Sequence, residues 1–454
     1  MKLPNYFLAD LPPEATLSPA LLSEACVALK RNRESYLLRH SSEHIIRVLA
    51  EVVAGWLEPG NPFRELALEH GPAQLGFSRA TLERGLDGFF RQLTSENFRA
   101  LLEQEFGDAR RLDDLVASEA ERAGDRAAIV TGPEFLVHIA AGNIPNPTLM
   151  SMVLGMLTRS AQFVKCASGT TLLPRLFAHS IHEFEPKLAA CLEVAEWRGG
   201  DAALEVALFA AADCVTATGS DETLLAIRNR LPARARFLGY GHRVSFGYVA
   251  SDVLTPLHAK KIIARAADDV VAWDQLGCLS PHVLYVQSGG AVSPVQFAEQ
   301  LAAELARREE REPRGRLTTE LAAHIASRRS IYEMRAAHSS DTTQLWQSPE
   351  STAWTVVCEA EARFQISSLY RFIYVKPVRD LGEVIESADA VRGQVSTVGV
   401  AVPEHRMGEV ATQLARWGVT RVCPLGQMQN PPLGWRHDGR PALADLVTWT
   451  DFES

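Results

Sequence analysis

From Arg126 onward the chain alternates short apolar runs with stretches of helical spacing, and this alternation restricts the fold more than any other feature. The runs with strand character are AAIVT, FLVHIAA, AQFVKCA, LEVAEW, DCVTATG and RVSFGYV. Helix-like segments such as NPTLMSMVLGML and DETLLAIRNRL lie between them. Strands that alternate with helices at this spacing predict a parallel, doubly wound sheet. Ligands bind such a sheet at the carboxyl ends of its strands.

A second α/β block begins near Leu254. Its first helix, PLHAKKIIARAADDVVAWDQ, leads directly into Gly277 and Cys278. Further strands are predicted at HVLYVQS, RFIYVKPV, STVGVAV and TRVCPLG. The residues before Arg126 have helical periodicity, in segments that open on serine, a common helix N-cap. The chain is therefore expected to be an α/β protein with two α/β blocks and a helical N-terminal region.

Composition excludes several classes of function. Among 454 residues, 46 are basic and 55 acidic, for a net charge of −9, and no basic stripe is interleaved with aromatic residues. We expect no nucleic acid partner, because neutralising phosphates requires clustered Lys and Arg. The N-terminal residues lack the long apolar core of a signal peptide, and no apolar run approaches the roughly 18 residues that span a bilayer.

The cysteines are odd in number and scattered, without a CxxC pair. They are Cys26, Cys166, Cys191, Cys214, Cys278, Cys358 and Cys423. This set argues against a disulfide framework and against structural zinc, so we expect no metal and a reduced, cytoplasmic protein.

Cys278 differs from the other cysteines in its sequence context. It stands in DQLGCLSPH, after Gly277 and before the Ser280–Pro281 turn, whereas the others lie within apolar runs. A free cysteine is most often a small buried hydrophobe. At a junction between elements, however, unpaired backbone N–H groups lower a thiol pKa and bind an oxyanion. Both a core thiol and a nucleophile remain open from this stretch alone.

Three other sites have residues suited to ligands or catalysis. In TATGSDET a predicted strand ends at Thr218 and Gly219 lets the backbone turn. Ser220 then caps a helix whose N–H groups suit a pyrophosphate; a plain helix cap is the alternative. In AAGNIPNPTLM, Asn143 is either an oxyanion donor or an ordinary asparagine turn. Lys165 ends a strand at the ligand edge, where it is either exposed or directed at ribose or phosphate.

Taken together, these motifs resemble the long-chain acyl-CoA reductase family, the fatty-acid reductases of bacterial luminescence operons, within the aldehyde dehydrogenase superfamily. The motifs that carry the resemblance, in order, are GNIPNP, FLGYGHRVSFGYV, DQLGCLSPHVLYV and VCPLGQMQNPPLGWRHDGRPALADLVTWTD. The match covers roughly residues 125–454. It implies an aldehyde-dehydrogenase-like fold with a helical part of the cofactor domain at 1–125, a Rossmann-type NAD(P)-binding domain at 126–253, a catalytic α/β domain at 254–430, and an active-site loop and tail at 431–454.

The resemblance also implies a role for each candidate residue. Cys278 falls at the nucleophile position and Asn143 at the oxyanion asparagine. Lys165 matches the lysine that reaches the adenosine ribose. Gly219 and Ser220 match the pair that opens the helix beneath the pyrophosphate. The segment NPPLGWRHDGR resembles the loop at the active-site mouth.

Two departures from the superfamily pattern bear on the reaction. In RFLGYGHR, Phe237 stands where aldehyde-oxidising relatives keep a glutamate base, and an acyl-enzyme that is to be hydrolysed needs such a base. This favours reduction, with nearby His242 as our candidate for moving protons. After Lys165 no acid occurs within five residues and Ser168 lies in the predicted cofactor loop, which favours NADPH while leaving NADH possible.

We therefore predict NADPH-dependent reduction of a long-chain acyl-CoA or other acyl thioester to the fatty aldehyde through a Cys278 acyl-enzyme. The alternatives are an oxidative aldehyde dehydrogenase, a cysteine acyltransferase or thioesterase without redox chemistry, and a non-catalytic scaffold. The resemblance also implies an acyl-protein synthetase or transferase partner and a homo-oligomer formed through a β-hairpin, to which AAIVT and FLVHIAA are expected to contribute.

Overall fold

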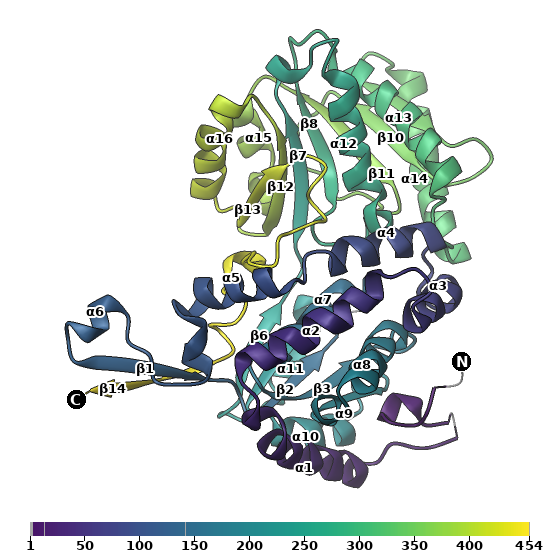
Figure 1. The fold of residues 1–454 in the computed structure, drawn as a ribbon. Coiled ribbons are helices and arrows are strands. Elements are labelled where there is room, and N and C mark those ends of the chain that lie inside the picture. The colour runs from purple at the N-terminus through teal and green to yellow at the C-terminus, as the bar shows by residue number, and fades with distance from the viewer. Residues whose placement is uncertain (1–2, 13, 141, 454) are drawn as a thin grey trace.

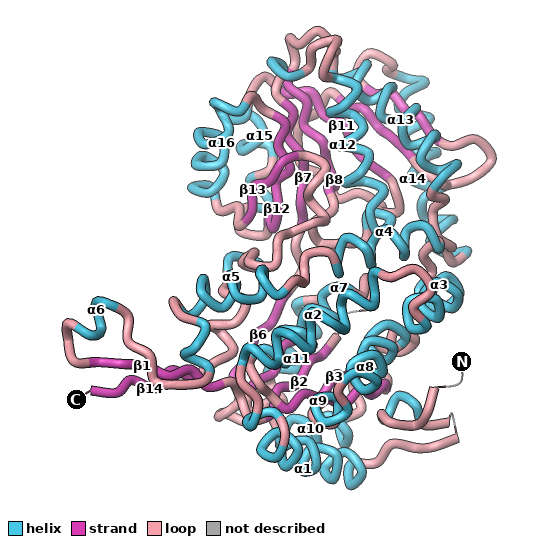
Figure 2. Tube along the Cα trace, viewed as in Figure 1, coloured by secondary structure: helices cyan, strands magenta, loops and turns pink. Residues whose placement is uncertain are grey.

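The computed structural model describes residues 3–12, 14–140 and 142–453. The chain forms two lobes, each built on a mainly parallel sheet that is covered by helices (Figure 1). A two-stranded ribbon projects from the lower lobe, and α4 and α5 lie where the lobes meet. In Figure 2 the strands form the centre of each lobe and the helices its outside. No helix among the described residues is long and apolar enough to cross a bilayer.

The N-terminal region is helical, as its periodicity predicts. Its main helices are α1 (Pro19–Ser35), α2 (Ser42–Leu57), α3 (Pro62–Leu75), α4 (Arg79–Phe90), α5 (Ser95–Phe106) and α6 (Glu119–Arg122). Ser18, Ser41 and Ser78 cap α1, α2 and α4 by accepting backbone N–H bonds within the first turn. The apolar faces of α2 to α5 pack on the helices of the lower sheet, so this region belongs to one core with it.

The lower lobe contains the doubly wound sheet that the alternation predicts. Its strand order is β4-β3-β2-β5-β6, all parallel. The strands are β2 (Phe135–Ile139), β3 (Ala161–Cys166), β4 (Leu192–Glu196), β5 (Cys214–Thr218) and β6 (Arg236–Tyr240). The helices between them are α7 (Asn146–Leu157), α8 (Leu172–Phe184), α9 (Pro186–Ala189), α10 (Ala202–Ala211) and α11 (Asp221–Arg228). The order reverses between β2 and β5, which puts a ligand crevice at their carboxyl ends.

The upper lobe contains a larger sheet, of order β13-β12-β7-β8-β11-β10-β9, in which β9 is antiparallel to β10. Its strands are β7 (Val244–Val249), β8 (Pro281–Gln287), β9 (Thr343–Gln347), β10 (Thr355–Glu359), β11 (Phe372–Val378), β12 (Val395–Ala401) and β13 (Arg421–Pro424). The main helices are α12 (Ala259–Val271), α13 (Pro294–Arg311), α14 (Thr319–His338), α15 (Leu381–Ser387) and α16 (Glu404–Trp417).

Two strands lie elsewhere than the sequence suggests. The strand at 244–249, expected in the first α/β block, pairs with β8 and β12 of the upper sheet. The segment AAIVT, grouped with FLVHIAA in the sequence, forms β1 (Arg126–Thr131) and pairs antiparallel with β14 (Thr448–Glu453). Local patterning identifies a strand, but its partners are set by distant segments.

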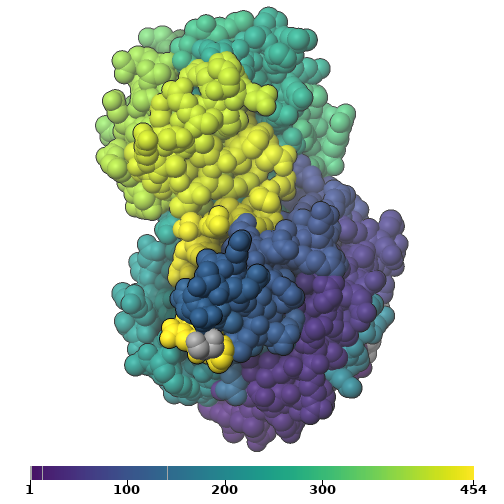
Figure 3. Space-filling view, turned by 60° about the vertical axis from the view of Figure 1, so that its left-hand side comes forward, coloured from purple at the N-terminus to yellow at the C-terminus, as the bar shows by residue number. Residues whose placement is uncertain are grey.

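The C-terminal segment connects the lobes. After β13 it leaves the upper lobe, crosses to the lower one and ends in β14 beside β1, as the yellow surface in Figure 3 shows. Leu433, Leu443 and Leu446 are buried in the core of the lower lobe. The segment is therefore anchored at both ends and lies over the junction between the two sheets.

Candidate active site

A cavity of about 160 Å³ lies at the junction of the lobes, and Cys278 is in its wall. Its walls come from the end of α4, the first turns of α7, the ends of β5 and β6, the Cys278 turn and the C-terminal segment. Residues on these walls include Phe89, Gln92, Ile144, Asn146, Met150, Leu154, Thr218, Tyr240, Leu279, Gln429, Leu433, Trp435 and His437. Apolar side chains thus surround the Cys278 thiol beside the edge of the lower sheet.

Cys278 lies in a short turn that connects α12 to β8. Unlike the other cysteines, it is only partly buried. The Ser245 hydroxyl of β7 donates to its carbonyl oxygen at 2.8 Å. Gly277 has no room for a side chain, because an added Cβ would lie 2.6 Å from the Gln429 amide nitrogen. These contacts hold the backbone on both sides of the thiol.

The surroundings of the Cys278 thiol favour its neutral form. Burial raises its pKa to about 12, and the Asp438 carboxylate raises it further. The backbone N–H groups of Cys278 and Leu279 lower the pKa, as does Arg243, but less than burial raises it. The same N–H groups suit an oxyanion on an acyl group attached to Cys278. Forming the thiolate therefore requires a nearby proton acceptor.

His437 is a candidate for that acceptor. It lines the same cavity, and its ring stacks on Tyr240 at a centroid distance of 4.5 Å. Burial lowers the pKa of His437, which favours the neutral imidazole. The adjacent Asp438 is held by Arg243 at 3.3 Å and by the Ser396 hydroxyl at 3.1 Å. Sequence reasoning placed this loop at the site mouth but missed its histidine; the WRHD motif was the available signal.

Two asparagines flank the start of α7. Asn143 is exposed, and its amide nitrogen donates to the Leu276 carbonyl oxygen at 3.0 Å, two residues before Cys278. Asn146, three residues further on, lines the cavity itself, and its buried side-chain oxygen has no hydrogen-bond partner. The structure thus brings the predicted Asn143 to the Cys278 turn and adds Asn146, which the sequence did not single out.

His242 does not line this cavity. Its side chain is exposed, and its backbone N–H donates to the Asp221 carboxylate at 3.3 Å. Phe237, at the position of the missing base, packs with the hydrophobic cluster of the lower sheet, and Tyr240 is the β6 residue in the cavity wall. Among the described residues that line the cavity, none carries a carboxylate.

The carboxyl edge of the lower sheet has the features of a dinucleotide site. Lys165 ends β3 with 6% of its surface exposed, and its ammonium lies 5.6 Å from the centre of the Trp197 ring. Within the described chain no hydrogen bond or ion pair engages this ammonium. Burial lowers the pKa of Lys165, although Glu205 and Glu196 favour its charged form. A buried cation that donates no hydrogen bond at this edge suits a polar or anionic ligand.

The turn after β5 lies at the same edge. The Gly219 N–H donates to the Tyr240 carbonyl oxygen at 3.2 Å, and the Ser220 hydroxyl accepts from Thr223 to cap α11. Ser168 is exposed in the loop after β3. The structure also brings an acid to that loop: the Glu196 carboxylate accepts from the Gly169 N–H at 2.9 Å. The sequence neighbours of Lys165 contain no acid, because Glu196 reaches the loop from the next strand.

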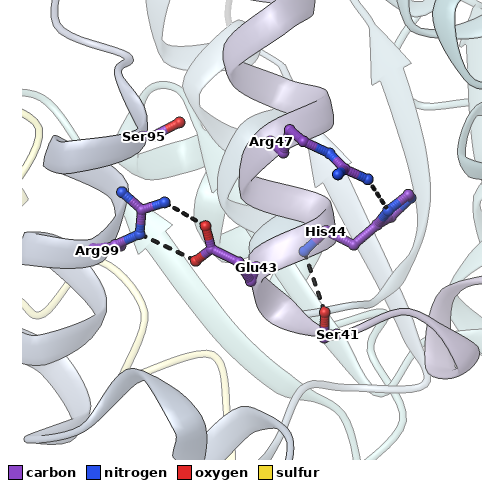
Figure 4. A pocket seen from close by; sticks show the side chains of 6 residues that line it. All are labelled: Ser41, Glu43, His44, Arg47, Ser95 and Arg99. Carbon is purple, nitrogen blue, oxygen red and sulfur yellow. Dashed lines mark hydrogen bonds and ion pairs between the residues drawn. The ribbon is translucent and has the colours of Figure 1, made fainter.

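A second hollow lies on the lower lobe between the first turns of α2 and α5 (Figure 4). Arg99 of α5 pairs with Glu43 of α2 across it, and Arg47 bonds the His44 ring at 3.0 Å. Its residues are all distinct from those around Cys278. The paired charges are explained by contact between the two helices.

The family model of acyl-CoA reductase (LuxC) matches residues 37–449 of the chain. The long-chain acyl-protein thioester reductase 2 of Photobacterium leiognathi is 24% identical over 322 residues, covering 70% of this chain and 63% of the relative. The long-chain acyl-protein thioester reductase of Aliivibrio fischeri is 24% identical over 325 residues, with the same coverage. The matched part is thus slightly less than two thirds of these relatives' length.

Solved aldehyde dehydrogenases have a similar fold. The NAD-dependent benzaldehyde dehydrogenase of Corynebacterium glutamicum superposes with a TM-score of 0.69 at 14% identity, over 97% of this chain and 91% of that one. A variant of proline utilization A from Bradyrhizobium japonicum superposes with a TM-score of 0.72 at 16% identity. The superposition covers 96% of this chain and 45% of that one. At these identities the likeness concerns the fold, and it confirms the aldehyde-dehydrogenase-like architecture predicted from the sequence.

Proposed function

Because the chain belongs to the acyl-CoA reductase (LuxC) family, we propose that it reduces an acyl thioester to an aldehyde with NADPH, through an acyl-enzyme on Cys278. The observation that carries the proposal is the placement of Cys278 in a largely apolar cavity beside the carboxyl edge of the lower sheet. The ends of β5 and β6 line the same cavity, so an acyl group and a dinucleotide would meet beside the thiol.

The first half-reaction exchanges one thioester for another. The neutral His437 ring takes the Cys278 proton, and the sulfur attacks the thioester carbonyl carbon. The Cys278 N–H and the Asn143 amide stabilise the oxyanion that forms. As the carbonyl re-forms, the carbon–sulfur bond to the donor breaks, and His437 returns its proton to the departing thiolate. Atoms and charge balance without a water molecule.

In the second half-reaction a bound NADPH would supply hydride to the acyl carbon on Cys278. The thiohemiacetal oxyanion would then re-form the carbonyl group as the bond between carbon and the Cys278 sulfur breaks, so that the aldehyde is released and the Cys278 thiolate takes up a proton. Lys165, Ser168, Gly219 and Ser220 are the residues that would hold the dinucleotide. Glu196 accepts from the Gly169 N–H, which leaves its carboxylate charged, and that charge counts against a 2′-phosphate. We keep NADPH as the proposed reductant on the sequence pattern around Lys165, with NADH as the alternative that Glu196 favours.

The absence of a carboxylate from the described cavity lining supports reduction over oxidation. A hydrolytic step would need a base that activates water, and Phe237 occupies the position where that base is expected. An acyl transfer without redox chemistry needs no dinucleotide, so it does not account for the buried Lys165 ammonium at the carboxyl edge of the sheet. These observations favour the reductase among the alternatives.

Two partner proposals accompany this function. The acyl donor is a CoA or protein thioester, by analogy with the acyl-protein thioester named in the relatives. A homo-oligomer is proposed through the projecting ribbon, because every residue of β14 is exposed, including Trp449 and Phe452. Apolar residues on an uncovered strand are typical of an association surface.

The test uses purified protein, a panel of acyl-CoAs and NADPH, with absorbance at 340 nm and mass spectrometry of the intact protein. We expect an acyl adduct on Cys278 that disappears when NADPH is added. Cys278→Ala should abolish the adduct and lower turnover by at least about 10⁴-fold, whereas Cys358→Ala, in the buried core, should retain both. An adduct that NADPH never discharges would contradict the reductase and indicate acyl transfer.

A further inference from the structure

The backbone just before Cys278 adopts a conformation that L-residues avoid. Trp273, Asp274 and Gln275 have φ values of 51°, 50° and 66°, which is a left-handed turn without glycine. A second such turn occurs at Leu369, Tyr370 and Arg371, with φ values of 60°, 53° and 65°. Each residue in this region costs free energy, and such strain persists only where surrounding contacts enforce it.

A buried ion pair fastens the two turns together. The Arg371 guanidinium contacts one oxygen of Asp274, with Nε at 2.9 Å and Nη2 at 2.8 Å. The other Asp274 oxygen accepts from the Gly315 N–H at 2.9 Å. Asp274 is 2% and Arg371 1% exposed. Both oxygens of this carboxylate are therefore used to hold the strained turn in place.

The Gln275 side chain closes the loop that contains the nucleophile. Its amide nitrogen donates to the Pro281 carbonyl oxygen at 2.7 Å and to that of Phe372 at 2.9 Å. Cys278 lies midway between Gln275 and Pro281, so this one amide joins the two ends of its loop. The bond to Phe372 ties the same loop to the start of β11.

A third contact comes from the lower lobe. The Trp273 ring lies against Gly85 of α4, where an added Cβ would overlap the ring atoms. Trp273 also packs edge-on against Phe77 at 5.2 Å. The end of α4 supplies Phe89 to the cavity wall, so the left-handed turn is wedged against a helix that borders the site.

We propose that Asp274, Arg371 and Gln275 are positioning residues that direct the Cys278 thiol into the cavity. This inference rests on the proposed function, since it assumes that Cys278 is the nucleophile. These residues do not touch the substrate. Their contacts hold residues 273–275 in the left-handed path against its strain, and this fixes the point from which the 276–280 loop starts. Misplacing a nucleophile by about 1 Å costs on the order of 10²-fold in rate.

The first test is Arg371→Lys, which keeps the charge but loses the two-pronged contact with Asp274. We expect the rate of Cys278 acylation to fall about 100-fold with little change in substrate KM. The control is Lys376→Met, because Lys376 and Glu359 form another buried pair in the same sheet, away from the Cys278 loop. Lys376→Met should lower the melting temperature by about as much as Arg371→Lys does, while its acylation rate stays within about twofold of that of the wild type.

The second test leaves the Asp274–Arg371 ion pair unchanged. Gly85→Ala improves helix propensity but forces the Trp273 ring to move. Gly408→Ala is the matched control in α16, where an added Cβ has no atom within 4 Å. We expect the Gly85 variant to acylate at least about tenfold more slowly, and the Gly408 variant to behave as wild type.

Alkylation of Cys278 by iodoacetamide, followed by peptide mass spectrometry, separates this inference from the proposed function. A changed alkylation rate in Arg371→Lys and Gly85→Ala supports positioning even if no acyl thioester is a substrate. Wild-type alkylation and acylation rates in both folded variants would overturn the inference and leave the ion pair as a stabilising contact only. An absence of acylation in the wild type would refute the proposed function alone.

Discussion

The carboxyl edge of the lower sheet, our proposed dinucleotide site, and the Cys278 turn both contribute residues to one cavity, but they are built in different ways. At the edge, β5 leads through Gly219 into α11, and a serine caps the helix. At the turn, three consecutive non-glycine residues are left-handed and a buried ion pair holds them. The first geometry is the ordinary strand-to-helix connection of a doubly wound sheet. The second exists only because distant residues enforce it.

This difference matches what the two proposed ligands, a dinucleotide and an acyl thioester, require of their sites. A dinucleotide needs a long edge with N–H groups and a cation, which regular elements present without strain. A nucleophile must be placed to within a fraction of an ångström, and a loop held from several sides achieves this. Substitutions at the turn should therefore affect acylation, and substitutions at the edge should affect cofactor binding.

The largest effect expected of a single side chain beside the thiol is that of Asn143→Ala. Loss of one oxyanion donor should slow acylation by about 10²–10³-fold. The substitution also removes the contact with the Leu276 carbonyl oxygen. Quenched-flow acylation followed by intact mass measures the rate, with Asn146→Ala in parallel. Near-normal acylation in the Asn143 variant, with a large loss in the Asn146 variant, would move the role to Asn146.

His437→Asn should lower kcat by about 10²-fold, because it removes the proposed proton acceptor from the cavity that Cys278 also lines. His242→Asn is the matched control, since His242 lies outside the cavity lining, and it should stay within about twofold of the wild type. Steady-state rates of both variants at pH 7 test the assignment. A large loss in His242→Asn with a near-normal rate in His437→Asn would instead assign the proton transfer to His242.

The pH dependence of Cys278 alkylation sharpens the contrast with an exposed thiol. Because the pKa of Cys278 is raised to about 12, its thiolate fraction grows about tenfold per pH unit throughout the range from 7 to 10. The alkylation rate should rise in parallel without a plateau. A rate that levels off near pH 8 would contradict the neutral thiol and indicate a lowered pKa.

The smallest expected effect is at the edge. Lys165→Met should raise the KM for NADPH by roughly tenfold or less and leave acylation of Cys278 unchanged, because one charged hydrogen bond is lost. Lys187→Met is the control: Lys187 also lies over an aromatic ring, that of Tyr36, but away from the edge. If Lys165→Met slowed acylation of Cys278 instead, the assignment of cofactor binding to the sheet edge and of acylation to the Cys278 turn would be wrong.

Much of the fold follows from local patterning. Strands such as β3 and β8 are buried on both faces and read as apolar runs in the sequence. By contrast, β6, β9, β10 and β14 were not predicted. Most residues of β6, β9 and β14 are partly or fully exposed, so no apolar run marks them, whereas β10 is buried throughout and its short apolar run was missed. Their pairing is decided by the sheets they join rather than by their own residues.

The chain's own sequence determined the two α/β blocks, the junction position of Cys278 and the strand-end position of Lys165, because periodicity and turn residues act over a few neighbours. Only the tertiary structure decided that β7 joins the upper sheet, that His437 and Glu196 reach the site, and that Arg371 holds a turn 97 residues away. These contacts depend on chain crossings and on burial. Both arise only when the whole molecule has folded.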